Sequence, residues 1–561
     1  MSYRAPVRDL ALSLQIAGHP ALVSGAFAEL DDDTVAAVLE AAGAFTEEQL
    51  APLNRKGDQV GARYENGAVI AAPGFADAYQ AFVAGGWNSL SADPEHGGQG
   101  LTKAMELAVF EMVHASNMAF GLCPMLTQGA IEALDLHGTE RQKSLVLPKL
   151  VSGEWTGTMN LTEPQAGSDV GALTTRAERA EDGSYRVTGQ KIFITWGDSD
   201  VTENVCHLVL ARLPDGGKGT RGISLFMVPK FIPDADGNPG VANDLRVVSL
   251  EHKLGIHGSP TCVMSFEGAK GWLVGEEHKG MAAMFTMMNC ARLGVGVQGV
   301  AQAEAALQQA VAYAAERNQM GPIIRHPDVR RMLAESRAEV FAARAICMAC
   351  AVALDMARAT GSEDWAARGA LLTPIAKAHG TDVGIRVADT AVQVHGGMGY
   401  IEETGAAQYL RDVRITAIYE GTNGIQAMDL VGRKLMDGGA AAMALLDEIL
   451  DGAKAAQAEE PELANQVWQA AETLREATLE LLDRDLDERF AGAVPYLAAF
   501  ARVLGGHFHL RAATGGGSKA LARVYIARIL PHFAADLAAA RAGLADLQAL
   551  DEAVFAGQMA G

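Results

Sequence analysis

Hydrophobic and polar residues follow three successive patterns along the chain. Residues 31 to 150 are rich in Ala, Leu, Met and Glu, with breaks at clusters of Gly, Pro and Asn, which predicts helices. Short apolar, β-branched and aromatic runs then predict strands at residues 185–187, 191–195, 207–213, 223–228 and 261–266. From near Gly280 to the C-terminus the pattern again predicts helices, with a break around residues 437–439.

The order of these elements predicts a mostly α protein with a β domain. No helix-length periodic segment separates the strands, so we expect a compact antiparallel barrel or sandwich rather than a βαβ sheet. The expected domains are an N-terminal helical domain (1–155), a middle β domain (156–275), a C-terminal helical bundle (276–435) and an additional helical domain (436–561). In the last domain a packed helix face is predicted by the spacing of Leu463, Val467, Ala470, Leu474, Ala477 and Leu481.

Length, charge and hydropathy narrow the class of protein. A chain of 561 residues is too long for one ordinary core. Its 46 basic and 68 acidic residues give a net charge of −22, which disfavours nucleic acid and anionic membranes as partners. No apolar run reaches the roughly 18 to 20 residues that span a bilayer, and no signal-peptide core follows the first charged residues. We therefore expect a cytoplasmic protein that neither binds nucleic acid nor inserts into a membrane.

Two local patterns resemble known site motifs but are interpreted as packing features. Cys347 and Cys350 form a lone CxxC in an Ala-rich helical stretch, so we predict buried core thiols and assign no metal site. Gly294, Gly296 and Gly299 spell GxGxxG, but no parallel strand precedes them and a predicted helix continues through them. We interpret these glycines as a small-residue face for helix packing.

Four further segments carry candidate chemistry. They are Asn160-Leu-Thr-Glu-Pro-Gln-Ala-Gly-Ser-Asp169, Gly189-Gln-Lys-Ile-Phe-Ile-Thr195, Gln393-Val-His-Gly-Gly-Met-Gly-Tyr400 and Ile418-Tyr-Glu-Gly-Thr-Asn-Gly-Ile-Gln426. Taken alone, the first segment favours a Pro/Gly turn with capping hydroxyls. Its hydroxyls and flexible glycine backbone also suit close approach to a polar ring or a phosphate. Four such segments in this order are far more specific than any one of them.

Together, these segments resemble the acyl-CoA dehydrogenase family, flavoproteins that desaturate acyl-CoA thioesters between the α and β carbons. The resemblance runs from about Gly86 to Leu435. It implies an N-terminal helical domain, a middle β-barrel or sandwich and a C-terminal four-helix bundle, to which this chain adds a further helical domain. It also implies non-covalent FAD, electron transfer flavoprotein as the electron acceptor, and a homodimer or higher homo-oligomer.

The same resemblance assigns the catalytic and substrate-binding residues. Glu420 aligns with the family's catalytic base, and a carboxylate suits removal of a weakly acidic proton beside a thioester carbonyl. A few members place the base on the helix that bears Arg292, but Ala291 occupies the corresponding position here. The implied substrate-binding residues are Ser168, Arg292, Tyr419 and Gly421.

Ten residues align with FAD-binding positions of the family. They are Thr162, Gly167, Ser168, Phe193, Thr195, Arg317, Gln393, Gly396, Gly397 and Thr422. Arg317 corresponds to an arginine that reaches the FAD pyrophosphate of a neighbouring subunit, a role that suits a bidentate cation. Phe193 stands where many relatives have Trp, whereas Met159 and Met320 replace frequent aromatic residues.

The length of the chain resembles a longer bacterial branch of the family. That branch includes 3-methylmercaptopropionyl-CoA dehydrogenases of dimethylsulfoniopropionate (DMSP) degradation and broad fatty acyl-CoA dehydrogenases. We therefore expect 3-methylmercaptopropionyl-CoA or a short- to medium-chain acyl-CoA as substrate, with a broad or long-chain substrate as the alternative.

Two other classes of function stay open at this stage. An acyl-CoA oxidase would keep the base and the flavin, and no motif separates it from a dehydrogenase. A DNA-binding relative with a similar C-terminal extension is disfavoured, because residues 435–561 hold 10 basic and 18 acidic side chains.

Overall fold

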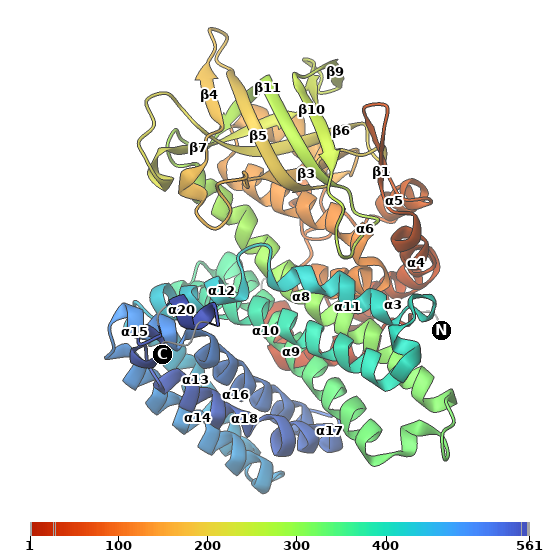
Figure 1. Cartoon of the computed structure of the whole chain (residues 1–561), viewed down its shortest axis with the longest axis vertical. Coiled ribbons are helices and arrows are strands. Elements are labelled where there is room, and N and C mark those ends of the chain that lie inside the picture. Colours follow the sequence, from red (N-terminus) through yellow and green to blue (C-terminus); the bar gives the residue numbers. More distant parts are fainter. Residues whose placement is uncertain (1–2, 26, 28–29, 551, 558–561) are drawn as a thin grey trace. The chain divides into compact units, whose positions relative to one another are not determined.

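The computed structural model describes residues 3–25, 27, 30–550 and 552–557 (Figure 1). Contacts within the chain divide it into two compact units. The first unit contains Met1–Val7, Leu30–Gly294 and Ile401–Ile415, and the second contains Arg8–Glu29, Val295–Tyr400 and Thr416–Gly561.

The first unit contains the helices predicted for residues 31 to 150. They are α3 (Asp32–Phe45), α4 (Ala51–Val60), α5 (Phe75–Ala84), α6 (Lys103–His137) and α7 (Glu140–Val151), with a π-helical turn at Thr46–Leu50. Polar side chains define where these helices begin: the Asp31 carboxylate accepts from Thr34 N at 2.8 Å. The Thr102 hydroxyl likewise accepts from Met105 N at 3.1 Å. Each cap satisfies an amide that has no partner inside its helix.

A small β-hairpin, which the sequence pattern did not predict, interrupts this helical region. Strands β1 (Arg63–Glu65) and β2 (Ala68–Ile70) pair antiparallel. Asn66 and Gly67 connect them with φ angles of 53° and 84°. These left-handed angles are those of a tight hairpin turn, for which Asn-Gly is a favoured sequence.

The β domain of the first unit is a closed barrel. Its strands are β3 (Trp155–Asn160), β4 (Arg176–Arg179), β5 (Tyr185–Thr195), β6 (Asn204–Arg212), β7 (Ile223–Pro229), β10 (Leu245–Leu250) and β11 (Thr261–Val274), and β8 (Phe231–Pro233) pairs separately with β9 (Pro239–Ala242). Pairing runs β11–β5–β4–β6, and β7 joins β6 back to β11, which closes the ring. Apolar side chains such as Val187, Phe226 and Phe266 fill its core.

The barrel is not wholly antiparallel, which corrects the sequence prediction. β3 pairs parallel with β6 along six residues, and β4 also meets β6 in parallel. The remaining pairs of the sheet are antiparallel. The predicted runs at residues 185–187 and 191–195 form the single strand β5, in which a register shift occurs opposite Cys262 and Met264.

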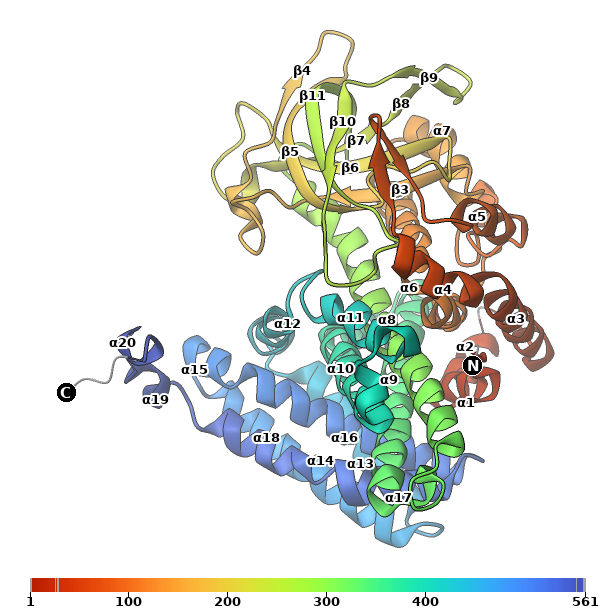
Figure 2. The ribbon, with the colours of Figure 1, turned by 45° about the vertical axis from the view of Figure 1, so that its right-hand side comes forward.

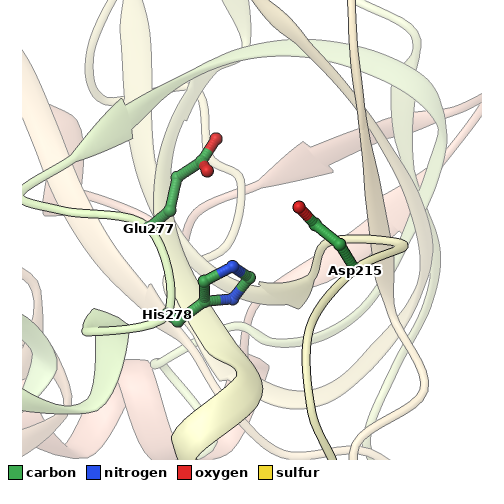
Figure 3. A group of neighbouring side chains, drawn as sticks. All are labelled: Asp215, Glu277 and His278. Atoms are coloured by element: carbon green, nitrogen blue, oxygen red, sulfur yellow. The ribbon is translucent and has the colours of Figure 1, made fainter.

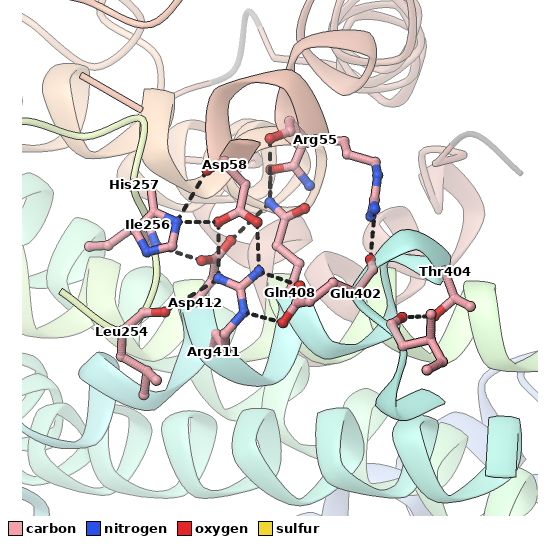
Figure 4. A network of polar contacts seen from close by, with 12 residues as sticks. Arg55, Asp58, Leu254, Ile256, His257, Glu402, Thr404, Gln408, Arg411 and Asp412 are labelled. Atoms are coloured by element: carbon pink, nitrogen blue, oxygen red, sulfur yellow. Dashed lines mark hydrogen bonds and ion pairs between the residues drawn. The ribbon is translucent and has the colours of Figure 1, made fainter. Parts of the chain in front are cut away.

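A polar network holds residues 401–415 in the first unit, although they follow a helix of the second unit in sequence (Figure 4). Helix α11 (Ala406–Val413) supplies Arg411, whose guanidinium donates to the Asp58 carboxylate at 3.0 and 2.6 Å. Asp58 also pairs with His257 Nδ1 at 2.7 Å. The buried Asp412 carboxylate accepts from Ile256 N at 2.5 Å, and burial raises the pKa of Asp412 to about 6. The network thus joins α4, the 254–257 loop and α11.

The second unit is helical among its described residues. It contains α1 (Val7–Ala17), α2 (His19–Val23), most of α8 (Gly280–Glu316), α9 (Pro327–Thr360), α10 (Glu363–His395) and α12 (Asn423–Asp429). Helix α9 is long and apolar enough to cross a membrane, which corrects the expectation that no apolar run reaches that length. However, 83% of its apolar window is buried inside the protein, as in a core helix. Cys347 and Cys350 are buried in α9, which confirms that they are core thiols.

The glycine pattern in α8 is a packing feature, as predicted. A Cβ on Gly296 would lie 2.7 Å from the Ala376 carbonyl oxygen, and one on Gly299 would lie 2.3 Å from the Gly380 carbonyl oxygen. These glycines therefore allow α8 to approach the α10 backbone closely. The GxGxxG lies within a helix, and a dinucleotide-binding loop is excluded at this place.

The C-terminal extension consists of helices α13 (Ala440–Ala456), α14 (Pro461–Leu482), α15 (Leu486–Ala491), α16 (Ala493–Thr514), α17 (Lys519–Val524) and α18 (His532–Arg541), followed by the short α19 (Ala545–Gln548) and α20 (Glu552–Phe555) (Figure 2). The apolar face predicted for α14 is confirmed. All six of its residues, from Leu463 to Leu481, are buried.

Candidate active site

A buried ion pair fixes the loop that follows β3. The Lys191 ammonium on β5 lies 2.9 Å from the Glu163 carboxylate, and the two side chains are only 0% and 2% exposed. Lys191 also donates to the Leu161 carbonyl at 2.9 Å, and Ile192 N donates to the Thr162 carbonyl at 2.9 Å. The loop carrying Thr162 is therefore held against β5.

The Glu163 carboxylate has further hydrogen-bond donors that keep it ionised. Thr174 N and Thr175 N donate to it at 2.7 and 3.0 Å. Burial alone raises the pKa of Glu163, but the Lys191 charge and these donors outweigh burial and hold the pKa at about 2. The carboxylate thus joins the 161–166 loop to the start of β4.

The predicted flavin-side residues of the first unit lie on this loop and on β5. Gly167 and Ser168 are exposed, whereas Thr162 and Thr195 are partly buried. The register shift in β5 is a bulge at Ile192 and Phe193, and Phe193 adopts a φ of 61°. Bulges re-aim side chains at functional sites, and the Phe193 ring is 58% exposed. The structure therefore brings these predicted residues to neighbouring segments of one unit.

Arg292, which belongs to the same unit, lies on α8 and is 6% exposed. Its guanidinium donates to Asn289 Oδ1 at 3.3 Å and lies 5.8 Å from the centre of the Phe285 ring. On the same helix the side chains of Met284 and Met287 are fully buried.

The predicted catalytic segment lies between α11 and α12 and belongs to the second unit. Glu420 is partly exposed and adopts a φ of 56°, and Gly421 follows with a φ of 85°. A left-handed glutamate is uncommon and costs on the order of 1–3 kcal/mol, so surrounding contacts must maintain it. On the N-terminal side of Glu420, the Tyr419 hydroxyl donates to Gln298 Oε1 at 2.5 Å.

Contacts on the other side complete the support of this segment. Gln426 Nε2 donates to the Glu420 carbonyl at 3.2 Å. The buried Lys377 ammonium donates to the Gly421 carbonyl at 2.8 Å. The Thr422 hydroxyl accepts from Ile425 N at 3.3 Å and caps α12. The backbone that carries Glu420, the one carboxylate residue between α11 and α12, is thus held on both sides.

The remaining predicted cofactor residues meet where α8 and α10 end. The rings of Tyr313 and His395 stack with centroids 4.3 Å apart, and Arg317 N donates to the Tyr313 carbonyl at 2.8 Å. This stacking brings Arg317 to the same region as Gln393, Gly396 and Gly397, all of which are exposed. Neighbouring apolar side chains are also exposed, with Met320 at 98% and Tyr400 at 88%.

The predicted residues therefore form two sets, one in each unit. Thr162, Gly167, Ser168, Phe193, Thr195 and Arg292 lie in the first unit, and Arg317, Gln393, Gly396, Gly397, Tyr419, Glu420, Gly421 and Thr422 lie in the second. The juxtaposition of the two sets around one ligand stays a prediction.

Comparisons with known proteins cover nearly the whole chain. Acyl-CoA dehydrogenase models for the N-terminal, middle and C-terminal domains match residues 32–154, 158–269 and 278–436, and an acetyl-CoA dehydrogenase C-terminal-like model matches residues 442–551. The chain is 46% identical over 520 residues to 3-methylmercaptopropionyl-CoA dehydrogenase of Ruegeria pomeroyi, covering 89% of this chain and 88% of that protein. The chain belongs to the acyl-CoA dehydrogenase family.

Two further comparisons extend this result. The chain is 36% identical over 464 residues to the broad-specificity linear acyl-CoA dehydrogenase of Mycobacterium tuberculosis, covering 77% of this chain and 75% of that protein. Its fold matches ACDH-11 of Caenorhabditis elegans with a TM-score of 0.81 at 22% identity, over 94% of this chain and 91% of that chain. The acyl-CoA dehydrogenase fold with an added C-terminal helical domain is thereby confirmed. As a family member, the chain is an oxidoreductase that acts on acyl-CoA.

Acyl-CoA dehydrogenases are FAD-dependent, and the residues present here fit that cofactor. A Cβ added to Gly167, Gly396 or Gly397 would meet no atom within 4 Å, so the backbone at all three places is open to a close ligand. The exposed Phe193 ring offers a flat apolar surface, and Arg317 offers a bidentate donor for phosphate. These are the groups that a planar ring and a pyrophosphate require.

Sequence reasoning missed the charged residues that support these segments. Glu163 and Lys191 lie inside two of the recognised motifs, but their pairing is not visible in either one. Lys377 is a lone lysine in the apolar run of residues 370–378, which was its only signal. Lys and Glu are rarely fully buried without a partner, so a charge within a predicted core element indicates a specific contact.

One cluster of potential metal ligands occurs within the described ranges. Ligand atoms of Asp215, Glu277 and His278 lie within 4.8 Å of one another (Figure 3). Arg179 already pairs with both carboxylates, at 3.1 Å to Asp215 and 2.7 Å to Glu277. Because this arginine compensates the negative charge, the cluster carries no metal assignment.

Proposed function

We propose that this chain catalyses the FAD-dependent α,β-dehydrogenation of an acyl-CoA thioester to the trans-2-enoyl-CoA, with Glu420 as the base. The observation that carries the proposal is the Tyr419–Thr422 segment. It presents one carboxyl group from a left-handed backbone that Gln298, Gln426 and Lys377 support. Strained backbone of this kind persists where function requires it.

In the proposed reaction Glu420 takes the α proton of the acyl group as that C–H bond breaks. The Glu420 backbone N–H donates to the thioester oxygen and stabilises the negative charge that develops there. FAD, when bound, would supply the oxidant for the β hydrogen, which leaves as hydride as the C–C double bond forms. Tyr419 and Gly421 flank the thioester, while Ser168 and Arg292 face the CoA side. Thr162, Thr195 and Thr422 hold the cofactor through their polar groups.

For the substrate we propose 3-methylmercaptopropionyl-CoA or a short- to medium-chain acyl-CoA, and hence a role in DMSP degradation in the cytoplasm. Similarity to the Ruegeria pomeroyi enzyme supports this choice, and similarity to the broad-specificity mycobacterial enzyme supports the alternative of a broad or long-chain substrate. One methylene changes discrimination in an apolar pocket by only about 1–3 kcal/mol, so the chain length must be measured.

A panel of acyl-CoAs tests this assignment. We expect kcat/KM with a dye acceptor to be highest for 3-methylmercaptopropionyl-CoA, butyryl-CoA and valeryl-CoA, and lower toward palmitoyl-CoA. The thioether and valeryl chains have similar length, so a separate preference for the thioether would show recognition of sulfur. A maximum at twelve carbons or more would contradict the short-substrate proposal.

The electron acceptor distinguishes a dehydrogenase from an oxidase. We propose electron transfer flavoprotein as the acceptor, as the family resemblance implies. After reduction by substrate, the enzyme should reoxidise slowly in air and rapidly with electron transfer flavoprotein in stopped-flow absorbance. Rapid reoxidation by oxygen alone would favour the oxidase alternative.

We also propose that the enzyme is at least a homodimer in which Arg317 binds the FAD pyrophosphate of the neighbouring subunit. The exposed Arg317, Met320 and Tyr400 support this proposal, because a second subunit would cover them. Light scattering should give at least twice the mass of one chain.

We expect Arg317→Ala to lose FAD on gel filtration, whereas Arg331→Ala, which removes an exposed ion pair with Glu335, should retain it. A fully active FAD-bound monomer would refute the role of Arg317 in trans.

A further inference from the structure

Lys377 is a fully buried lysine whose charge lies against the loop of the proposed base. Its side chain is 0% exposed on α10. The ammonium donates to the Gly421 carbonyl at 2.8 Å and to Asn423 Oδ1 at 2.9 Å. Both acceptors belong to the segment directly after Glu420. A charged donor forms stronger hydrogen bonds than a neutral one, especially in a buried setting.

Asn423 also contacts the next turn of α10. Its Nδ2 donates to Asp382 Oδ1 at 2.7 Å and to Thr381 Oγ1 at 2.9 Å. Residues 377–382 of α10 therefore bind both the oxygen and the nitrogen of the Asn423 side-chain amide, and Lys377 also binds the Gly421 carbonyl. We call Lys377, Asn423 and their contacts the α10 clamp.

The α10 clamp contacts a segment in which two successive residues have left-handed φ angles. Glu420 has a φ of 56° and Gly421 a φ of 85°. Gln426 Nε2 donates to the Glu420 carbonyl at 3.2 Å and more weakly to the Gly421 carbonyl at 3.5 Å, whereas Lys377 makes the shorter contact to the Gly421 carbonyl, at 2.8 Å. With both carbonyls fixed, the peptide planes on the C-terminal side of Glu420 cannot rotate independently.

We propose that Lys377 is a positioning residue for the proposed reaction: through the Gly421 carbonyl it holds the Glu420 carboxylate and backbone N–H in their reactive orientation. The inference rests on the proposed role of Glu420 as the base. Proton abstraction requires near-contact geometry, and a displacement of about 1 Å from a distant change costs roughly 100-fold in rate. Lys377 therefore acts on the chemical step rather than on the binding of acyl-CoA.

Lys377→Met tests the proposal because Met keeps the apolar stem and removes the donors. This variant should fold, because both acceptors of Lys377 keep another donor: Gln426 Nε2 lies 3.5 Å from the Gly421 carbonyl and Thr381 Oγ1 lies 3.2 Å from Asn423 Oδ1. We expect kcat to fall roughly 100-fold, with flavin content and KM nearly unchanged. The kinetic isotope effect on an α-deuterated substrate should increase, because proton abstraction becomes more strongly rate-limiting.

A readout without turnover separates positioning from catalysis. In the apoenzyme, hydrogen exchange of the amides from Glu420 to Asn423 should be faster in Lys377→Met than in the wild type. Asn423→Ala, at a partly exposed position, should lower kcat by roughly tenfold because one arm of the clamp is lost. Arg386→Gln is the matched control, since Arg386 lies on α10 but pairs with Glu339 at 2.9 Å, and it should leave kcat and exchange unchanged.

The possible outcomes separate this inference from the proposed function. Normal kcat and normal exchange in Lys377→Met, together with an inactive Glu420→Gln, would overturn the positioning role alone. A Glu420→Gln variant of normal activity would overturn the proposed function, whatever Lys377→Met does. Parallel losses of kcat, flavin content and thermal stability in Lys377→Met would show a merely structural role and also overturn the inference.

Discussion

Replacing Glu420 with Gln is expected to abolish steady-state turnover while leaving FAD bound. Gln has the shape of Glu, so the Tyr419–Thr422 segment and its contacts to Gln298, Gln426 and Lys377 should survive. The amide cannot accept the α proton at neutral pH. Loss of a general base costs about 10²–10⁴-fold in rate, and no other carboxylate is assigned to this role. Flavin absorbance and stopped-flow reduction by acyl-CoA measure the two parts of this expectation.

Glu472→Gln provides a matched control for the charge change. Glu472 lies on α14 in the C-terminal extension and pairs only loosely with Arg475, at 3.8 Å. That variant should reduce its flavin at the wild-type rate. If Glu420→Gln also reduced FAD at the normal rate with acyl-CoA, the assignment of the base would be wrong.

Local periodicity predicted helices in which buried residues recur at a regular spacing along the chain. The α14 stripe from Leu463 to Leu481 lies on one buried face because a helix returns to the same side every 3.6 residues. The α8 glycines were recognised as packing residues because their neighbours in sequence already specify a helix. Both inferences need only residues within a few turns.

Features that depend on distant residues were not predictable in this way. The parallel pairing of β3 with β6 joins segments about 50 residues apart, and an alternating or apolar pattern carries no strand direction. The hairpin at Asn66-Gly67 was a different failure, because its turn signal is present in the sequence but the flanking strands have only three residues each.

In the candidate site, too, residues in local motifs were predictable and residues that contact them from distant segments were not. The motifs predict Glu420, Thr162 and Gly396 as site residues because their residue types and order are characteristic of a family. They gave no information about Lys377, which lies 44 residues before the carbonyl it binds. Lys377 contacts this loop because α10 packs against residues 419–423. A single sequence contains no pattern that shows which lysine will reach which carbonyl group.

Removing Glu163 is expected to have the largest effect on stability and on FAD retention. In Glu163→Ala the Lys191 ammonium would stay buried without its carboxylate partner. Breaking one half of a buried ion pair costs about 3–5 kcal/mol, far more than the pair contributes relative to an apolar core. Thr174 N and Thr175 N would also lose their acceptor. Because the 161–166 loop is held through this carboxylate, we expect the variant to unfold at lower urea concentration and to lose FAD.

The matched control and the pH dependence make this last prediction specific. Glu267→Ala removes an exposed pair with Arg246 on the same sheet, at 2.9 Å, and should change stability little.

The pKa of Glu163 is about 2 in the folded protein, below its usual value of 4.5. The carboxylate therefore stabilises the fold fully above about pH 4.5, and that stabilisation disappears as the pH falls toward 2. The contribution of the Glu163 carboxylate to the difference in unfolding free energy between wild type and Glu163→Ala should accordingly be constant from pH 7 to 5 and shrink below pH 4.5. A Glu163→Ala variant with wild-type stability and full FAD content at pH 7 would show that the ion pair does not hold the loop.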